Sequence, residues 1–502
     1  MTGAAAPSIT HTLLAQRLRE VARILIPGRD DLPAEPAELL ATLLAAVIPE
    51  PGHGRLWLLV SAATGAYPLP DALEALRRRL ELCSPDERVP VFLAETLRDA
   101  ADRGDWNRPV RIVVGGTFVD VNFCAKYVHN TGIQRVVRRM VPQLLAVATE
   151  HPQAPQIELL AWTRESGITR TLNPVERDRV VAWDTHDRRA RASDTGAGEI
   201  VIPWRSRVLL PEVAEPELID RLAGFAEYSG NWIGVVAHDL IPVSSAQFVD
   251  ARESDRTAQY LRIIKHADAV FTVSESVAGE FAGFVAALGA QGITGPAIRA
   301  IPLAMGSADS SPTGASADDG AALVLCVGSH EPRKNQEALL FAAEVLQREG
   351  LKFRMVFVGG GSRRNTFSFD QRVRRLHDRD GLTIESLRGV GDADLWQLYH
   401  SARFTALLSL HEGFGLPVVE SLAHGTPVLT SDFGSMAEIA RAGGCVTVDP
   451  RDDDAIVEAM RGMLTDDALI RQLRAEIANI PARTWRDYAT ELWEAARLGT
   501  AP

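Results

Sequence analysis

Two series of short apolar segments, each alternating with longer amphipathic segments, constrain the fold of this chain more than any other feature. The first series lies within residues 106–306 and consists of PVRIVVGGTFVD, IELLAWT, RVLLP, NWIGVVAHDLIP and ADAVFTVSES, each of which predicts one strand. The second lies within residues 322–480 and includes LVLCV, FRMVFV, FTALLSL and PVLTS. Short buried strands that alternate with helices predict parallel sheets with crossover helices. The polar low-complexity stretch at 307–321 separates the two series, so we predict two doubly wound α/β domains joined by a linker.

The region before the first series has a different pattern. Residues 1–105 contain THTLLAQRLREVARILI and LPDALEALRRRLELC, in which apolar residues recur every three or four positions. This period predicts a helical extension. Its partner is left open, and an acceptor, a membrane surface and a second chain are the candidates. The stretch LLAQRLREVARILI is amphipathic and basic, so it fits either a helix at a membrane interface or a helix packed on the protein core.

Composition narrows the class of protein. The chain has 502 residues with 46% hydrophobic and 24% charged residues, which is typical of a globular protein of two to four domains. The net charge of -12 argues against a general nucleic-acid binder. The four cysteines form no CxxC pair, which favours free thiols in a reducing compartment. No signal-peptide core and no run of eighteen apolar residues is present, so we expect a cytoplasmic protein, with peripheral contact at the inner membrane face left open.

The stretch LHEGFGLPVVESLAHG has the composition of a ligand-binding loop. It follows an apolar strand, and Pro417 suits the first turn of a helix that contains Glu420. Glu412 then lies in the loop, where Gly413 and Gly415 allow the backbone to approach a ligand closely. A helix start binds phosphate and carboxylates accept hydrogen bonds from sugar hydroxyls, so a nucleotide-sugar fits this layout. The alternative is an ordinary loop glutamate and a helix-start glutamate that complements the helix dipole.

This stretch resembles the E-x7-E region of glycosyltransferase family 4, whose members have the GT-B fold of two Rossmann-like domains facing a cleft. The resemblance covers residues 111–498 and implies a C-terminal helix, within 481–502, that crosses back to the N-terminal domain. The N-terminal elements are similar to those of bacterial mannosyl- and rhamnosyl-transferases of surface polysaccharide synthesis. The motifs that carry the resemblance, beside HEGFGLPVVESLAHGTPVLTSDFGSMAEI, are LCVGSHEPRKNQEALLFA, VFVGGG, GVGDADLWQLYHSA, WRDYATELWEAAR, VVAHDLIP and NTGIQRVVRRM.

The resemblance implies a role for each matching residue. Glu420 would hold the ribose hydroxyls, Glu412 would contact the donor sugar and Lys334 would clamp the diphosphate. The family often has an arginine after the glycine of this last loop, where Ser329 stands here, and Arg333 is the candidate substitute. The alternative for the two cations is a basic surface at a helix start, but cations there oppose the helix dipole and favour an anionic ligand.

In the N-terminal domain, Gly132 would bring a helix start near the donor phosphates, unless Thr131 or Asn130 merely caps that helix. His238 matches a family histidine near the donor sugar, although a lone histidine at a strand end is also often structural. Ser274 suits either the cleft or the cap of the next helix. The predicted catalytic residues are Glu412, His238, Lys334 and Arg333, and the predicted donor-binding residues are Glu420, Gly413, Phe414, Gly415, Leu416, Gly132, Ser329 and Asp239.

Metal chemistry of the Asp-x-Asp kind has two candidates, at 392–394 and 452–454. Each precedes a helical pattern, so helix capping explains both, and we expect no metal and no other cofactor. The positive charge at the leaving diphosphate would then come from Lys334, Arg333 and a helix start.

The predicted function is a retaining hexosyltransferase that uses a nucleotide-diphosphate sugar, with mannose or rhamnose favoured and GDP-mannose a weak preference. The acceptor would be a saccharide or a lipid-linked saccharide. Alternatives are a GT-B-fold sugar-nucleotide epimerase, a sugar-phosphate synthase, or a non-catalytic nucleotide-sugar-binding protein. The oligomeric state and the acceptor linkage are open.

Overall fold

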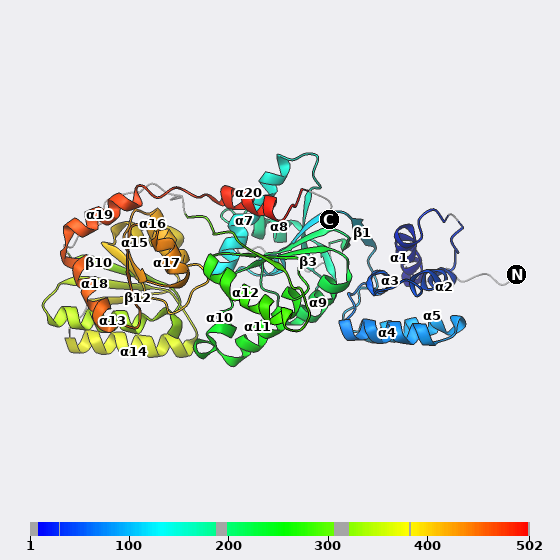
Figure 1. Ribbon diagram of the computed structural model, residues 1–502, viewed down its shortest axis with the longest axis horizontal. Helices are drawn as coiled ribbons and strands as arrows, with labels where there is room; N and C mark the ends of the chain where they lie inside the picture. The colour runs from blue at the N-terminus through cyan, green and yellow to red at the C-terminus, as the bar shows by residue number, and fades with distance from the viewer. Residues whose placement is uncertain (1–8, 30, 187–197, 306–320, 381–382, 500–502) are drawn as a thin grey trace.

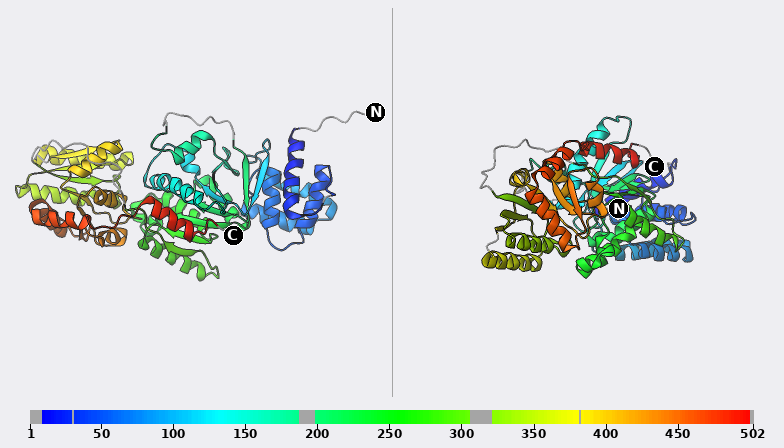
Figure 2. Two further views of the ribbon diagram at one scale, coloured as in Figure 1. Left: turned by 90° about the horizontal axis from the view of Figure 1, so that it is seen from above. Right: turned by 60° about the vertical axis from the view of Figure 1, so that its left-hand side comes forward.

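The computed structural model of the chain describes residues 9–29, 31–186, 198–305, 321–380 and 383–499. It places three bodies in a row, with the N-terminal helices at one end, a nine-stranded sheet in the middle and a six-stranded sheet at the other end (Figures 1 and 2). The linker predicted at 307–321 lies outside the described residues, except for its last position. Among the helices of the described ranges, none is long and apolar enough to cross a membrane.

The N-terminal helices pack directly on the middle domain. Trp57 stacks on Trp204 of the nine-stranded sheet with ring centroids 6.2 Å apart, and it stacks on Tyr67 at 5.0 Å. The buried side chain of Arg17 donates a hydrogen bond of 3.0 Å to the carbonyl oxygen of Arg108, at the entry to the first strand. The helices of this region are α1 (Ile9–Leu25), α2 (Pro36–Val47), α3 (Gly54–Thr64), α4 (Pro70–Leu82), the 3-10 turn η1 (Pro85–Glu87) and α5 (Arg88–Asp99).

The apolar face of α1 is covered by its neighbours. Leu18, Val21 and Leu25 are buried and belong to one hydrophobic core with the middle sheet. Of the two interpretations of this stretch, the structure therefore shows the packed helix, because the residues that would enter a membrane interface are already in the core.

The middle domain has the strand order β1-β5-β4-β3-β2-β6-β7-β8-β9, with β4 antiparallel to its neighbours β3 and β5. The apolar run at 110–120 was expected to form one strand, but it forms two, because Gly115 has a φ of 71° and turns the chain. Strands β4, β5 and β9 were not predicted. The strands are β1 (Val110–Val114), β2 (Thr117–Asp120), β3 (Ile157–Trp162), β4 (Thr169–Thr171), β5 (Ile200–Trp204), β6 (Arg207–Leu210), β7 (Trp232–Ala237), β8 (Ala269–Thr272) and β9 (Ala297–Ala300).

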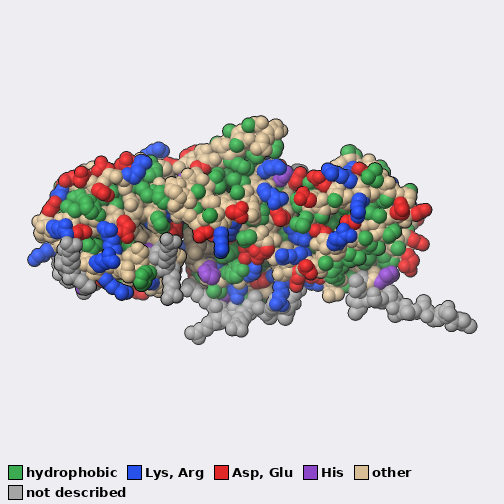
Figure 3. Space-filling model, turned by 90° about the horizontal axis from the view of Figure 1, so that it is seen from below, with side chains coloured by type: hydrophobic (Ala, Val, Ile, Leu, Met, Phe, Trp, Pro, Cys, Tyr) green, Lys and Arg blue, Asp and Glu red, His purple; other side chains and the backbone are tan. Residues whose placement is uncertain are grey.

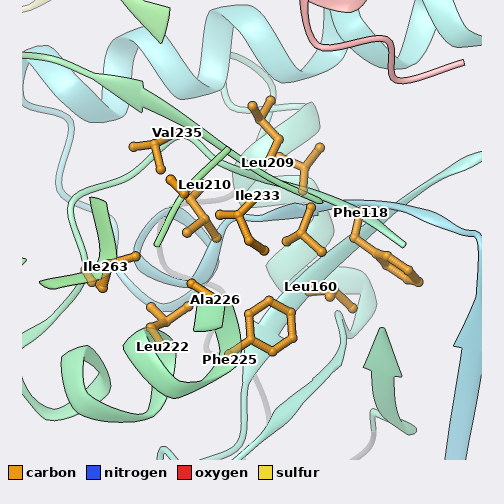
Figure 4. Close-up of a cluster of buried hydrophobic side chains, with 14 of the residues drawn as sticks. Phe118, Leu160, Leu209, Leu210, Leu222, Phe225, Ala226, Ile233, Val235 and Ile263 are labelled. Atoms are coloured by element: carbon orange, nitrogen blue, oxygen red, sulfur yellow. The ribbon is translucent and has the colours of Figure 1, made fainter. Parts of the chain in front are cut away.

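Helices cover the nine-stranded sheet and close its core. Figure 4 shows Leu209 of β6 and Ile233 of β7 packed with Phe225 of a covering helix, and all three side chains are buried. The helices are α6 (Asn122–Lys126), α7 (Gly132–Thr149), α8 (Pro174–Val181), η2 (Pro216–Leu218), α9 (Ile219–Tyr228), α10 (Ile241–Ser244), η3 (Ala246–Phe248), α11 (Ala251–Ile264) and α12 (Glu275–Gly289).

The C-terminal domain is a parallel sheet with strand order β12-β11-β10-β13-β14-β15, and each predicted strand is present. The order reverses between β10 and β13, which is where doubly wound sheets bind ligands at the carboxyl ends of their strands. The strands are β10 (Ala322–Val327), β11 (Phe353–Val358), β12 (Ile384–Leu387), β13 (Phe404–Leu407), β14 (Val428–Ser431) and β15 (Cys445–Val448). The helices are η4 (Pro332–Lys334), α13 (Gln336–Arg348), α14 (Arg363–Asp380), α15 (Asp392–Ser401), α16 (Leu416–Ala423), α17 (Gly434–Ala440), α18 (Asp453–Thr465), α19 (Asp467–Ile477) and α20 (Trp485–Ala495).

The last helix, α20, leaves the C-terminal domain and packs on α7 of the middle domain (Figure 1). The chain crosses between the domains twice, and the two crossings meet where the amide of Met305 donates to the carbonyl of Arg483 at 2.9 Å. Beyond α20, the hydroxyl of Thr117 donates to the carbonyl oxygen of Leu498 at 2.8 Å. The middle domain is therefore completed by the C-terminal end of the chain.

The surface of the described residues mixes the two signs of charge on the face that Figure 3 shows, where acidic and basic side chains alternate over all three bodies. On this face the two signs of charge are interspersed, and neither sign forms a broad patch.

The docking of α20 is testable by truncating its buried face. Leu492 is fully buried, so we expect Leu492→Ala to lower the free energy of unfolding by about 2–5 kcal/mol. The exposed neighbour Glu494 provides the control, and Glu494→Ala should change it by less than about 0.5 kcal/mol. Chemical denaturation followed by tryptophan fluorescence measures both variants. Equal stabilities would mean that α20 does not dock in solution.

Candidate functional site

A cavity of about 640 Å³ lies between the two α/β domains. It is formed by the carboxyl ends of β7, β10 and β13 together with the starts of α7 and α16, and its volume is in the range of small-molecule sites. All the residues that the sequence predicted to be catalytic or donor-binding line it: Gly132, His238, Asp239, Ser329, Arg333, Lys334, Glu412, Gly413, Phe414, Gly415, Leu416 and Glu420.

Glu412, in the loop after β13, is buried at the centre of a charged cluster. One of its carboxylate oxygens accepts from the Lys334 ammonium and, at 2.7 Å, from the Ser409 hydroxyl, and the other accepts from Arg333 at 2.9 Å. Burial by itself would raise the pKa of Glu412, but Lys334 and Arg333 outweigh it and lower the pKa to about 2. The carboxylate is therefore ionised throughout the neutral range, and two cations share its single charge.

Arg333 and Lys334 are adjacent in sequence, yet both reach the same carboxylate. The 3-10 turn η4 brings them onto one side, and it ends at Asn335 in the left-handed region with a φ of 52°. Arg333 also donates to Glu331 at 2.8 Å. The hydroxyl of Ser329 donates to Glu331, and the cations of this loop that line the cavity are Arg333 and Lys334.

Glu420 lies in the second turn of α16, on the other side of the cavity. Its carboxylate accepts from the Tyr399 hydroxyl at 3.1 Å and forms an ion pair with Arg135 of α7. Burial raises the pKa of Glu420, and the contacts with Arg135 and Tyr399 only partly oppose this effect. Because Arg135 belongs to the middle domain, this ion pair crosses the cleft.

Two helix starts face the cavity without a side-chain cap. Helix α16 begins after Gly415, whose φ of 111° is in the range that favours glycine, and helix α7 begins after Thr131. Thr131 occupies the cap position of α7, as one interpretation expected, but its hydroxyl donates to the side-chain oxygen of Gln134 and accepts no hydrogen bond from the helix amides. Uncapped amides and the positive ends of two helix dipoles favour an anion between them.

The domains touch through the loop that carries Glu412. A Cβ atom at Gly413 would overlap the carbonyl oxygen of His238, so only glycine permits this approach. The hydroxyl of Ser274 accepts from the Val277 amide as the cap of α12, and it also donates to the Gly413 carbonyl at 2.7 Å. Both interpretations of Ser274 are therefore correct, and the loop is held by the two domains at once.

Two further contacts across the cleft lie beside this loop. Glu438 of α17 accepts from the amide of Glu275 at 2.9 Å, at the start of α12. His411 lies 2.6 Å from Glu280 and hydrogen-bonds to Ser245 at 2.7 Å. The hydrogen bond to Glu280 raises the pKa of His411, although burial opposes it. The position of Glu412 therefore depends on residues of the middle domain.

His238 lines the cavity but makes a backbone contact. Its Nε2 lies 2.9 Å from the carbonyl oxygen of Pro211, which can only accept, so this nitrogen carries the proton. Burial lowers the pKa of His238, so the ring is neutral at pH 7. Asp239 follows, and one of its oxygens accepts from the Ile241 amide at 3.1 Å.

The two aspartate stretches differ in what they do. Asp452 caps α18 by accepting from the Ala455 amide at 2.9 Å, as predicted. The capping prediction for 392–394 is wrong, because Gly391 is the cap position of α15 and makes no side-chain bond, while Asp392 and Asp394 lie in the first turn, where their charges complement the helix dipole. Among the described residues, no three His, Cys, Asp or Glu side chains are close enough to hold a metal ion.

The sequence did not single out three residues that complete the cluster. Ser409 and Tyr399 bind the two glutamates, and Arg135 reaches Glu420 from the opposite domain. Arg135 lies three positions after Gly132 in the quoted motif NTGIQRVVRRM, so its place near the cavity is one helical turn from a predicted residue.

Comparison with known proteins gives a partial match along the chain. Residues 311–480 match the family described as Glycosyl transferases group 1. The chain is 33% identical over 175 residues to O-antigen chain mannosyltransferase B of Escherichia coli. The matched stretch covers 35% of this chain and 45% of that protein. It is 29% identical over 266 residues to a serotype-specific mannosyltransferase of Escherichia coli. This second match covers 51% of this chain and 32% of that protein. The chain therefore spans less than half the length of these curated relatives.

Among solved structures, the sucrose-phosphate synthase of Thermosynechococcus elongatus superposes with a TM-score of 0.52 at 16% sequence identity, over 76% of this chain and 98% of that one. At this identity the likeness concerns the fold alone. It confirms the predicted fold class of two α/β domains that face a cleft.

The tight contact at Gly413 is testable without any ligand. We expect Gly413→Ala to lower the free energy of unfolding by about 1–3 kcal/mol, because the added methyl group has to displace the backbone of His238. Gly279 of α12 is the matched control, since its Cβ would meet nothing within 4 Å, and Gly279→Ala should leave stability unchanged or raise it by up to about 1 kcal/mol. Thermal unfolding of the two variants and the wild type measures the effect. Equal unfolding midpoints for Gly413→Ala and Gly279→Ala would refute the close contact between Gly413 and His238.

Proposed function

We propose that this chain, which carries a glycosyl transferases group 1 domain on a GT-B fold, transfers a hexose from a nucleotide-diphosphate sugar to a saccharide acceptor. The observation that carries the proposal is the convergence of Arg333, Lys334 and two uncapped helix starts on one cavity at the point where the strand order reverses. These groups stabilise a diphosphate, and Glu412 and Glu420 lie on either side of it.

The donor fits the cavity in one direction. The diphosphate binds Lys334, Arg333 and the amides at the starts of α7 and α16. The ribose hydroxyls donate to the carboxylate of Glu420, which also accepts from the Tyr399 hydroxyl at 3.1 Å. The donor sugar lies towards Glu412 and His238. The neutral ring of His238, held through Nε2 by Pro211, orients the sugar and does not act as an acid.

The acceptor has a neighbouring cavity of about 910 Å³, which shares Asp239, Glu331 and Arg333 with the donor cavity. It lies between α10, η3 and α11 of the middle domain and the loops after β10 and β11. An acceptor hydroxyl that enters from this side meets the donor sugar beside Arg333. The mannosyltransferase relatives favour mannose as the sugar, and GDP-mannose and a lipid-linked acceptor are the specific candidates. Cytoplasmic location and a peripheral membrane contact stay predictions of the sequence.

The transfer would retain the anomeric configuration. The bond between the sugar C1 and the leaving phosphate oxygen breaks first, with an oxocarbenium-like transition state. The acceptor oxygen then bonds to C1 on the same face, and its proton passes to the leaving phosphate oxygen. Lys334, Arg333 and the helix starts stabilise the departing charge, so we propose that no metal is required and that turnover persists in EDTA. The anomer of the product tests the stereochemistry.

The assignment of the donor site is tested by nucleotide binding. Wild-type chain is titrated with GDP, UDP, dTDP and ADP, and then Glu420→Gln and Lys334→Ala with whichever of them binds. We expect one nucleotide to bind, both variants to lose affinity, and Lys334→Ala to lose about 100- to 1000-fold in turnover with the matching sugar nucleotide. Binding that survives in both variants would contradict this site. Turnover without a saccharide acceptor would instead indicate an epimerase or a hydrolase.

The pH dependence of binding gives an independent test. The raised pKa of Glu420 means that its folded carboxylate is protonated at a higher pH than the ordinary value of 4.5. As the pH falls through this range, protonation relieves the buried charge and stabilises the ligand-free chain, while the ribose loses its acceptor. We expect nucleotide affinity to fall with a midpoint above 4.5, and this limb to be absent in Glu420→Gln. Identical pH profiles in the two proteins would exclude Glu420 as its origin.

A further inference from the structure

Arg135 forms an ion pair with the carboxylate of Glu420, the group that the proposed function assigns to the ribose hydroxyls. Its guanidinium pairs with one oxygen of Glu420, and the other oxygen accepts from Tyr399 at 3.1 Å. In the ligand-free chain, therefore, both oxygens of Glu420 are already in use. Each oxygen can accept a second hydrogen bond, but Arg135 lines the cavity and is 34% exposed while Tyr399 is fully buried, so a ribose diol that approaches from the cavity competes with Arg135 for this carboxylate.

We propose that Arg135 changes its partner when the sugar nucleotide binds. It pairs with Glu420 in the empty cavity, and it binds the diphosphate of the sugar nucleotide once the ribose hydroxyls have taken its place on Glu420. The inference rests on the proposed function, because it takes Glu420 as the ribose-binding carboxylate.

The position of Arg135 suits both partners. It lies in the first turn of α7, three residues after Gly132, and the start of this helix faces the cavity without a side-chain cap. Gly132 approaches Leu416 at the start of α16, with 3.8 Å between the leucine Cδ1 and a Cβ built on the glycine. The anion-binding ends of the two helices are therefore neighbours, and a guanidinium one turn along α7 can turn between Glu420 and an anion at these ends.

The charges that line the cavity favour the release of a cation when a diphosphate binds. Among the described residues that line it, the cations are Arg135, Arg333 and Lys334, and they face four carboxylates. Arg333 and Lys334 both bind Glu412, and Arg333 also binds Glu331. A diphosphate brings further negative charge, and the ion pair that the ribose itself breaks is the one that frees a cation. Binding of the nucleoside part would thus prepare the site for the phosphates.

A fixed latch between the domains is the competing interpretation. In that case Arg135 would stay on Glu420 with the donor bound, and its removal would loosen the cleft for all ligands alike. The two interpretations differ in how Arg135 affects the nucleoside and the diphosphate separately.

The experiment measures the dissociation constants of a nucleoside and of its diphosphate, for example guanosine and GDP, with the base chosen as the one that the wild-type chain binds. The proteins compared are the full-length wild type, Arg135→Gln, Arg135→Lys and the control Arg139→Gln. Arg139 is one turn further along α7, pairs with Asp184 at 3.5 Å and does not line the cavity.

In Arg135→Gln we expect the nucleoside to bind about 3- to 5-fold more tightly, because its competitor for Glu420 is gone. The ratio of the nucleoside dissociation constant to the diphosphate dissociation constant should fall about tenfold, since one charge-assisted contact to the diphosphate is lost. Arg135→Lys should retain most of the diphosphate gain, and Arg139→Gln should match the wild type in both measurements. Thermal unfolding of each variant confirms that it is folded.

Two results would overturn the inference while leaving the proposed function in place. One is a nucleoside affinity that is unchanged or weaker in Arg135→Gln, and the other is a parallel change for nucleoside and diphosphate. A wild-type chain that binds none of the nucleotide pairs would overturn the proposed function itself, and the inference with it.

Discussion

The buried carboxylate of Glu412 between Lys334 and Arg333 is the interaction on which the site depends. A buried charge is costly unless it is paired, and two cations from one short turn pair this one from both sides. The pairing fixes the loop after β10 against the loop after β13, at the reversal of the strand order. It also places two cations at the wall of the cavity, where an anionic ligand can reach them. The same contacts thus hold the loops together and prepare the site.

The domain interface continues from this cluster. The loop that carries Glu412 packs its glycine on the backbone of His238, and the middle domain holds the loop through Ser274. Helix α20 closes the arrangement by returning the end of the chain to α7, the same helix whose start faces the cavity. A change in the angle between the domains would therefore alter the geometry around Glu412 and the reach of Arg135 together.

The accuracy of the sequence-based predictions differs between the domains for a physical reason. The four inner strands of the C-terminal sheet, β10, β11, β13 and β14, are mostly buried, so they appear in the sequence as nearly continuous apolar runs that predict strands. In the middle domain, β4 has the sequence TRT and carries no apolar pattern, and it forms because β3 and β5 offer it backbone partners. The split of the first apolar run at Gly115 was missed as well, since a positive φ at one glycine cannot be read from apolar periodicity.

From the sequence, local chemistry predicted the alternation of strands and helices and the glycine-proline loop with Glu412 and Glu420, because it specifies a strand end, a helix start and the carboxylates beside them. The other predicted cavity residues, such as Lys334, His238 and Gly132, came from the resemblance to a known family. Which charges neutralise one another was decided only by the tertiary structure. Arg135 and Glu420 are far apart along the chain, and Gly413 and His238 belong to different domains, so their contacts exist only after the two sheets face each other. The same holds for the N-terminal helices, whose amphipathic pattern fits several partners until the sheet beside them supplies Trp204 for Trp57 to stack on.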